Sequence, residues 1–489
     1  MNTKRFTILH SNDIHGDFQA ELDGAEGHLI GGLSLLSGYI NQVRQEEENV
    51  LYIIAGDMVQ GSMIDSEFKG VSTMELMNYL APDVATLGNH ELDYGLGHLL
   101  FLEKMANFPI VVANLYIKQY HKRLMQPYHI VNVAGFDIMF IGIITQEILQ
   151  ALKMDTDIGT FLTLEEASDE AGRICNAYKD EDIDLTVLLT HIGFESDKRL
   201  ATMLNPEWGV DLIIGGHSHT ILEEPAIIND ILITQAGVGS DQIGRFDIIV
   251  DDDTNSIVEW QWQLLPVDST LAEPDEEFQA FIDTFQQVVD RKYNTMICRL
   301  AQKLTHPLRE EETALGNLFA DILAQSAHAD IAFVGSGSIR GTQLGPIVTL
   351  GDLRRIYAYD GALYRFAVTG AQLTQIFTHI MRPDNRIPGE SQCQQVSRGV
   401  RAVYNDTTRS LESLAIDGQP VRDDQQYTIC LQEFHMINAA ANMGITGQEL
   451  REIAGPHVAT TSIREVLEEY LRHHQNLNSK VESRLVYTS

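Results

Sequence analysis

The chain has 489 residues, 44% of them hydrophobic, which is ordinary for soluble globular proteins and enough for two or more domains. Its formal net charge is −35, with 69 acidic residues against 34 basic ones. Binders of nucleic-acid polymers or of anionic membranes need a basic surface, so this balance argues against both classes of partner.

The four cysteines lie far apart and show no paired spacing typical of a zinc knot or a disulfide framework: Cys175, Cys298, Cys393 and Cys430. We expect reduced thiols.

The apolar segment 6–9 near the start is too short for the core of a signal peptide, and no uninterrupted apolar stretch reaches membrane-spanning length. These features predict a cytoplasmic protein.

The first half of the chain repeats one pattern, in which a short apolar strand is followed at once by Gly, Asp, Asn or His. Helical segments such as 32–46 lie between several of these strands. Such strands are typical of an α/β sheet, whose loops converge on one crevice at the carboxyl ends of the strands. The predicted strands are 6–9, 50–54, 84–87, 185–189 and 212–214.

The loops after these strands carry a mixed set of oxygen and nitrogen ligands without a thiolate: Asp13, His15, Asp57, Asn89, His191, His217 and His219. This set is too large for one tetrahedral zinc, but it fits two divalent cations that share a bridging carboxylate. Asp13 and His15 are separated by one residue, so their side chains lie on the same side of an extended segment. A single histidine is more often a surface or core residue, but five such loops predict a two-metal site.

A further polar stretch follows the third predicted strand, where Asn89, His90, Glu91 and Asp93 occur within five residues. His90 can donate a proton if Asp93, three residues later, holds its other ring nitrogen and stabilises the cation. Taken alone, the stretch is equally well explained as a capped helix start with acidic residues in the first turn.

These loops carry recognisable motifs: Asp13-x-His15, Gly56-Asp57, Gly88-Asn89-His90-Glu91, His191 and Gly216-His217-x-His219. The series resembles that of the calcineurin-like metallophosphatases. Ser11-Asn12-Asp13-Ile14-His15-Gly16, together with the stretch 88–93, resembles more narrowly the branch of 5′-nucleotidases, UDP-sugar hydrolases and 2′,3′-cyclic phosphodiesterases. The resemblance covers nearly the whole chain.

The resemblance implies an α/β fold with two domains. An N-terminal four-layer αββα metallophosphatase domain is expected over residues 1–270, and a linker helix over 271–300. An α+β 5′-nucleotidase-type domain, which binds the part of the substrate that does not react, is expected over 301–489.

The resemblance also divides the ligands between two ions, which we expect to be Mn, Zn, Co or Fe. One metal is assigned to Asp13, His15, Asp57 and His219, and the other to Asp57, Asn89, His191 and His217. His90 with Asp93 forms the acid dyad. The expected reaction is in-line attack of metal-bound hydroxide on a small phosphorylated substrate, above all a nucleoside monophosphate. His90 is expected to stabilise charge or to protonate the leaving alkoxide.

Two alternatives stay open at this point. The same site could hydrolyse cyclic nucleotides, nucleotide sugars or sulfur esters. A different class is an interaction module that binds metal without turnover, but the retained pair of His90 and Asp93 argues against it, because a scaffold does not need an acid dyad.

In the second half, apolar residues at helical spacing behind Pro274 predict a helix over 275–292, which we interpret as the connector between domains. The segments 312–321, 337–341 and 395–397 are similar to the 5′-nucleotidase C-terminal domain. Residues 383–389 predict a loop. A capping box, Ser462-x-x-Glu465, predicts a final helix over 462–473.

Arg340 follows the predicted strand 331–334 in a glycine-flanked loop and is our candidate clamp for a phosphate or carboxylate, because a guanidinium fork matches such groups. The alternative is an ordinary surface ion pair. In the resembling family, two aromatic rings in the loops near 395 and 442 enclose the base. Here the nearest residues are Cys393 and Ile445. Their presence predicts weak discrimination among bases, or a preference for a smaller phosphorylated or non-nucleotide compound.

Overall fold

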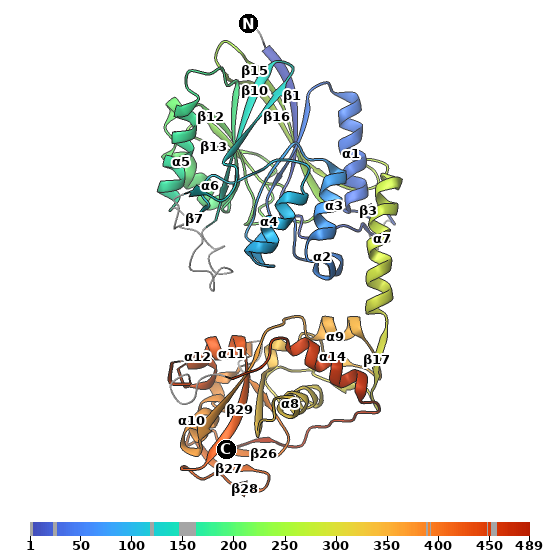
Figure 1. Ribbon diagram of the computed structural model, residues 1–489, viewed down its shortest axis with the longest axis vertical. Helices are drawn as coiled ribbons and strands as arrows, with labels where there is room; N and C mark the ends of the chain where they lie inside the picture. Colours follow the sequence, from blue (N-terminus) through green and yellow to red (C-terminus); the bar gives the residue numbers. More distant parts are fainter. Residues whose placement is uncertain are drawn as a thin grey trace. The chain divides into compact units, whose positions relative to one another are not determined.

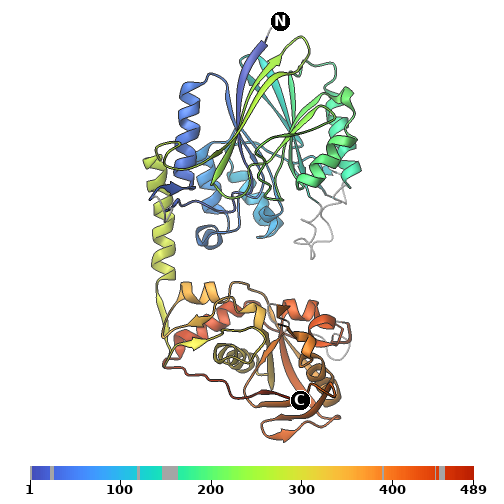
Figure 2. The ribbon, with the colours of Figure 1, turned by 180° about the vertical axis from the view of Figure 1, so that it is seen from behind.

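The chain divides into two compact units, Met1–Val289 and Asp290–Ser489, which Figures 1 and 2 show in the colours of the sequence. Among the residues described, no helix is both long and apolar enough to cross a membrane. The computed structural model describes residues 3–22, 27–117, 122–145, 163–387, 390–391, 393–446, 448–450 and 457–489.

Two six-stranded sheets form the centre of the N-terminal unit, with strand orders β16-β15-β1-β4-β5-β6 and β13-β14-β12-β11-β10-β9. The strands of the first sheet are β1 (Thr3–Ser11), β4 (Val50–Ala55), β5 (Val84–Thr86), β6 (Ile110–Val111), β15 (Gln242–Asp251) and β16 (Ser256–Pro266). Those of the second are β9 (Tyr128–Val133), β10 (Phe136–Ile144), β11 (Leu185–His191), β12 (Val210–Ile214), β13 (Ala226–Ile228) and β14 (Ile231–Thr234).

The two sheets pack face to face, and Phe6, Ile53 and Phe140 belong to the apolar core between them. Helices cover the outer faces, so the unit has four layers (Figures 1 and 2). This confirms the predicted αββα arrangement. The helices are α1 (Leu33–Glu46) and α3 (Val71–Leu80) beside the first sheet, and α5 (Leu164–Ala177) and α6 (Phe194–Met203) beside the second.

The central strands of both sheets run parallel: β1 with β4, β4 with β5, β10 with β11, and β11 with β12. Every residue of β11 is buried, as expected for a parallel strand covered on both faces. Because parallel strands end at the same edge of a sheet, the loops that follow β1, β4, β5, β11 and β12 meet at one end of the unit.

The C-terminal unit is built on a five-stranded sheet of order β25-β19-β29-β22-β30 and a four-stranded sheet of order β28-β27-β26-β31. The shorter or outer strands of these sheets are β25 (Gln394–Val396), β26 (Val400–Asn405), β27 (Ser410–Ile416), β28 (Gln419–Pro420), β30 (His457–Thr460) and β31 (Leu485–Thr488). Strands of both directions occur together with packed helices, which confirms the α+β class. Its main elements are α8 (Ala314–Ala327), β19 (Ile331–Gly335), α9 (Leu350–Ile356), β22 (Leu363–Thr369), α10 (Gly370–Ile380), β29 (Gln426–Gln432), α12 (Ala439–Met443) and α14 (Ile463–His473).

The predicted connector helix is α7 (Glu276–Tyr293), and the division between the units falls within it. In its first turns, Phe278 stacks on Tyr79 of α3, with ring centroids 4.2 Å apart. The range expected for the linker, 271–300, also contains β17 (Met296–Arg299), which pairs with β21 (Ile347–Thr349) of the C-terminal unit.

Two local predictions are corrected. The Ser462 hydroxyl accepts from the Glu465 N–H at 3.1 Å, but the Ser462 N–H donates to Thr460 Oγ1 at 3.2 Å, so the reciprocal half of the capping box does not form. The predicted loop 383–389 contains a 3₁₀ turn, Pro383–Asn385, and strand β23 (Arg386–Ile387), because proline suits the first position of a helical turn. Residues 388 and 389 lie outside the described residues.

Candidate active site

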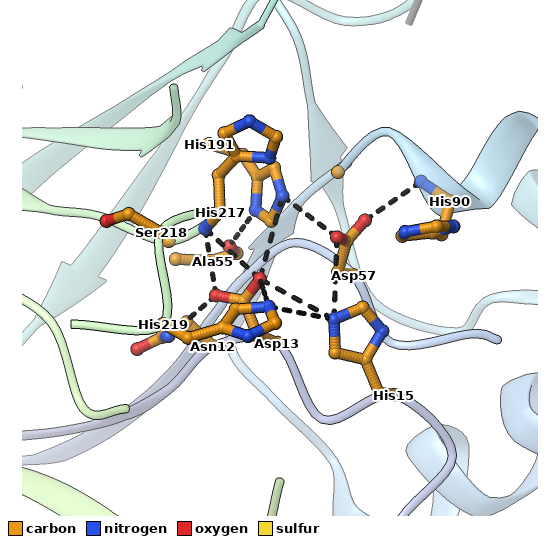
Figure 3. Close-up of polar contacts among 12 residues, drawn as sticks. Asn12, Asp13, His15, Ala55, Asp57, His90, His191, His217, Ser218 and His219 are labelled. Atoms are coloured by element: carbon orange, nitrogen blue, oxygen red, sulfur yellow. Dashed lines mark hydrogen bonds and ion pairs between the residues drawn. The ribbon is translucent and has the colours of Figure 1, made fainter. Parts of the chain in front are cut away.

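The predicted metal ligands converge at the carboxyl ends of the strands. Figure 3 shows close together Asp13, His15, Asp57, His191, His217 and His219. Five adopt the left-handed backbone region, with φ of 52° at Asp13, 51° at His15, 50° at Asp57, 82° at His217 and 53° at His219. Residues other than glycine rarely adopt this region, and such strained residues cluster at functional sites.

Asp13, His15 and His219 form one group, whose ligand atoms all lie within 4.8 Å of one another. Asp13 Oδ1 is 3.3 Å from His219 Nε2 and 3.8 Å from His15 Nε2. The two Nε2 atoms are only 3.1 Å apart (Figure 3). At this distance the two rings either share a hydrogen bond or, when both nitrogens carry lone pairs, a cation, and the neighbouring Asp13 carboxylate suits a cation.

Asp57, His191 and His217 form the second group, within the same distance limit of 4.8 Å. His191 Nε2 lies 3.1 Å from Asp57 Oδ2, and the opposite ring nitrogen, Nδ1, donates to the Ala55 carbonyl at 2.8 Å. That hydrogen bond leaves Nε2 free to bind a metal. The Asn89 Oδ1 is buried and has no hydrogen-bond partner among the described residues, as a metal-ligand oxygen would.

Asp57 also lies beside the first group, with Oδ2 3.8 Å from His15 Nε2. A carboxylate between the two groups is the arrangement that a bridging ligand requires. The donor set contains only imidazole, carboxylate and amide oxygen, which suits divalent Mn, Zn, Co or Fe. The residues present therefore fit two divalent cations.

His90 and Asp93 form the expected pair, with His90 Nδ1 2.7 Å from Asp93 Oδ2. The hydrogen bond to Asp93 raises the pKa of His90, and nearby Asp57 raises it further. His90 also lies within 4.8 Å of ligand atoms of His15 and Asp57. The alternative of a capped helix start is not seen, because Asn89 makes no side-chain capping bond to the 3₁₀ turn His90–Leu92.

Glu91 is a supporting residue to which the sequence interpretation gave no role. Its buried carboxylate accepts from the backbone N–H groups of Gly88 at 2.6 Å and Met58 at 2.7 Å, and from those of Asp57 and Val59 at 3.2 Å. Burial and the neighbouring Asp57 raise the pKa of Glu91 to about 7. Glu91 thus joins the loop that carries Asp57 to the loop that carries Asn89, and its place in the Gly-Asn-His-Glu motif was the only sequence signal.

The C-terminal unit contains a separate cavity of about 920 Å³, whose lining includes Arg340, Tyr359, Cys393 and Phe434. Arg340 Nη2 donates to the Tyr359 hydroxyl at 2.9 Å, and the Arg340 Cζ lies 4.8 Å from the Tyr359 ring centroid. Arg340 forms no ion pair with any residue that the structure describes, so the surface ion pair considered as its alternative is not seen.

The assignment of Ile445 to this cavity was wrong. Ile445 is 3% exposed and packs in the core of the unit with Phe377 and Met443, whereas Cys393 does line the cavity as predicted. The reason is local: Ile445 follows Gly444 in the left-handed region, a turn that leaves it in the core. The rings that line the cavity are Tyr359, 60% exposed, and Phe434, 65% exposed.

Comparison with known proteins matches both units to family models. The model described as calcineurin-like phosphoesterase matches residues 6–220, and that described as 5′-nucleotidase, C-terminal domain, matches residues 295–448. Each match lies within one unit of the structure, and the two occur in the same order as the units.

The chain is 25% identical to mouse 5′-nucleotidase, over 99% of this chain and 90% of that protein. It is 26% identical to endonuclease YhcR of Bacillus subtilis over 92% of this chain, which spans only 38% of that longer protein.

Among solved structures, a 5′-nucleotidase precursor from Thermus thermophilus has a TM-score of 0.65 at 22% identity, covering 99% of both chains. The NAD nucleotidase of Haemophilus influenzae has a TM-score of 0.60 at 18% identity, covering all of both chains. At these identities the structural matches show the fold alone. The two family models and the homologues together place this chain in the calcineurin-like 5′-nucleotidase family of metal-dependent hydrolases.

Proposed function

We propose that the protein releases phosphate from a nucleoside 5′-monophosphate. The observation that carries the proposal is the pair of His90 and Asp93 beside two groups of metal ligands. A protein that only stored or displayed metal would need the ligands but no acid held next to them. A phosphate monoester has an alkoxide leaving group, which is the kind that gains most from a proton donor.

The residues of the N-terminal unit have separate tasks in this proposal. Asp13, Asp57, Asn89 and the four histidines of the cluster hold two divalent cations, which when bound neutralise phosphate charge and lower the pKa of water. The hydrogen bond to Asp93 raises the pKa of His90 and so favours the protonated imidazole that would donate to the leaving oxygen. Asp93 fixes the His90 ring and stabilises its cationic form.

The cavity of the C-terminal unit supports a nucleotide as the substrate. Its volume of about 920 Å³ lies within the range typical of small-ligand sites. Arg340 offers a guanidinium for an anionic group, while the exposed rings of Tyr359 and Phe434 offer flat surfaces on which a base can stack. The net charge of −35 argues against a nucleic-acid polymer.

A substrate screen with the purified chain and added Mn, Zn, Co or Fe tests the proposal. The panel holds nucleoside 5′-monophosphates, ribose 5-phosphate, a 2′,3′-cyclic nucleotide, a nucleotide sugar and a sulfur ester. We expect the highest catalytic efficiency on a nucleoside 5′-monophosphate. A preference for the cyclic, sugar or sulfur compound would contradict the assignment, and so would absence of turnover on the whole panel.

His98 provides a matched control for the chemistry. It lies on α4 (Leu96–Met105), and its Nε2 contacts the Lys69 carbonyl rather than the ligand cluster. His98→Ala should keep the activity of the unaltered protein, whereas His90→Ala should lose most of it.

A further inference from the structure

Gln60 lies in the loop after β4, three residues beyond Asp57, and is firmly anchored there. Its backbone N–H donates to Asp65 Oδ2 at 2.9 Å. Asp65 is fully buried and also accepts from the Tyr94 hydroxyl at 2.8 Å. Gln60 itself adopts a left-handed backbone with φ of 72°, so this anchor holds a conformation that a free loop would rarely keep.

From this position Gln60 contacts both His15, a candidate metal ligand, and Asp93 of the acid dyad. Its carbonyl oxygen lies 3.0 Å from His15 Nδ1, so an Nδ1–H donated to it leaves His15 Nε2 facing Asp13. Its side-chain Nε2 donates to Asp93 Oδ2 at 3.2 Å. The same Asp93 oxygen lies 2.7 Å from His90 Nδ1.

The adjoining residue explains how the loop comes so close. A Cβ atom on Gly61 would lie 1.9 Å from the His15 carbonyl oxygen, so only glycine permits this approach. The loop after β4 therefore rests directly on the segment that carries His15, and Gln60 is fixed against it.

We propose that the Gln60 side chain is a positioning residue for the acid dyad, acting on His90 through Asp93. The Asp93 side chain is about a quarter exposed, at 26%, and without Gln60 its carboxylate can turn toward water. A second hydrogen bond to the same oxygen restricts that rotation. The proposal rests on the dyad role given to His90 in the proposed function.

The backbone and side chain of Gln60 can be tested separately. Gln60→Met keeps the chain length and imposes no greater strain at φ of 72°, because both side chains are unbranched. It retains the carbonyl that faces His15 and removes only the donor to Asp93. A purely structural role in the loop would therefore leave Gln60→Met close to the unaltered protein.

The first experiment is a double-mutant cycle with Asp93→Ala. We expect Gln60→Met to lower kcat on an alkyl phosphate by about 10-fold, with KM changed less than about twofold, because it removes one hydrogen bond to a charged group. In the Asp93→Ala background the same substitution should change kcat by less than about twofold. An equal loss in both backgrounds would overturn the proposal.

Two controls accompany the cycle. Gln42→Met, on the exposed side of α1, should leave kcat unchanged. Metal content measured on each purified variant should stay equal to that of the unaltered protein, because no ligand is removed. Loss of metal in Gln60→Met would assign the residue to metal binding and overturn its action through Asp93.

The second experiment needs no turnover, so it separates a failure of this proposal from a failure of the proposed function. A crystal structure of Gln60→Met should show the Asp93 carboxylate rotated away from His90 Nδ1. An unchanged Asp93 rotamer, with the hydrogen bond to His90 intact, would overturn the proposal whatever substrate the protein hydrolyses.

Discussion

The N-terminal ligand cluster and the C-terminal cavity differ in how their residues are held. Asp13 and Asp57 are buried in the loops that follow strands β1 and β4, whereas Tyr359 and Phe434 are more than half exposed. The histidines differ too: a hydrogen bond to Asp93 raises the pKa of His90, while burial lowers the pKa of His435 in the cavity wall to about 4. The N-terminal cluster brings charged and titratable groups together, whereas the C-terminal cavity offers aromatic surface.

The largest effect should follow from Asp57→Asn, because Asp57 lies between both ligand groups. We expect loss of metal at both positions and a fall in turnover of more than about 10⁴-fold. Metal analysis of the purified variant is the measurement. His219→Ala is the comparison and should lose mainly one equivalent; two full equivalents in Asp57→Asn would rule out the bridge.

The next largest effect should come from His90→Ala, which we expect to lower kcat by roughly 10²- to 10⁴-fold while metal content is kept. A substrate with a very good leaving group should lose less, because it needs less protonation. His90 lies within 4.8 Å of ligand atoms of His15 and Asp57, so metal content decides its role. If His90→Ala is purified without metal, His90 binds metal itself, and its assignment to the acid dyad is wrong.

Arg340→Ala tests the cavity as a binding site. Loss of a charge-assisted hydrogen bond should raise KM by about 10-fold, to the same extent for purine and pyrimidine monophosphates. Steady-state kinetics on both classes is the measurement. Arg355→Ala is the control, because Arg355 is 71% exposed and pairs with Asp352. An effect confined to one base would show that Arg340 contacts the base rather than a shared anionic group.

The smallest effect concerns stability and His435. Its folded-state pKa of about 4 is below the ordinary value of 6.5, so between these pH values the unfolded chain binds a proton that the folded chain does not. Stability is therefore lost as pH falls through this window, by up to about 1.4 kcal/mol per pH unit.

Replacing His435 by Gln should remove this part of the acid sensitivity. Denaturant unfolding at pH 7 and pH 5 should show a smaller drop for the variant than for the unaltered protein. His473→Gln, on the exposed end of α14, is the control. An identical drop in His435→Gln would show that His435 titrates normally in the folded chain.

The N-terminal ligand cluster could be predicted from the sequence more fully than the C-terminal cavity. Strand ends are marked by an apolar run followed by polar residues, and parallel pairing brings those ends together, so this pattern indicated all seven candidate metal ligands. The role of Glu91 depends on which backbone N–H groups face it after folding, and the role of Gln60 depends on the side chains of Asp93 and His15 that folding brings beside it. No residue pattern records either set of contacts. For the same reason Ile445 was placed on the cavity, although the turn at Gly444 leaves it in the core.

The aromatic residues of the cavity likewise could not be assigned from the sequence. Tyr359 and Phe434 are visible in the sequence, but exposed and buried aromatic residues look alike there: Tyr357, two residues before Tyr359, is fully buried. The prediction of weak base discrimination assumed that Cys393 and Ile445 occupy the two positions that enclose the base. The exposed rings of Tyr359 and Phe434 line the cavity instead, so that assumption no longer holds.

If the N-terminal unit performs the chemistry and the C-terminal unit selects the base, as proposed above, one ratio should separate the two tasks. The measurement is kcat/KM for adenosine 5′-monophosphate divided by kcat/KM for ribose 5-phosphate, in the unaltered protein, His90→Ala and Phe434→Ala. His90→Ala should lower both values and leave the ratio unchanged. Phe434→Ala should lower the ratio by about 10-fold, the worth of one stacking contact. An unchanged ratio in Phe434→Ala, or a strongly lowered ratio in His90→Ala, would show that the two units do not divide the tasks in this way.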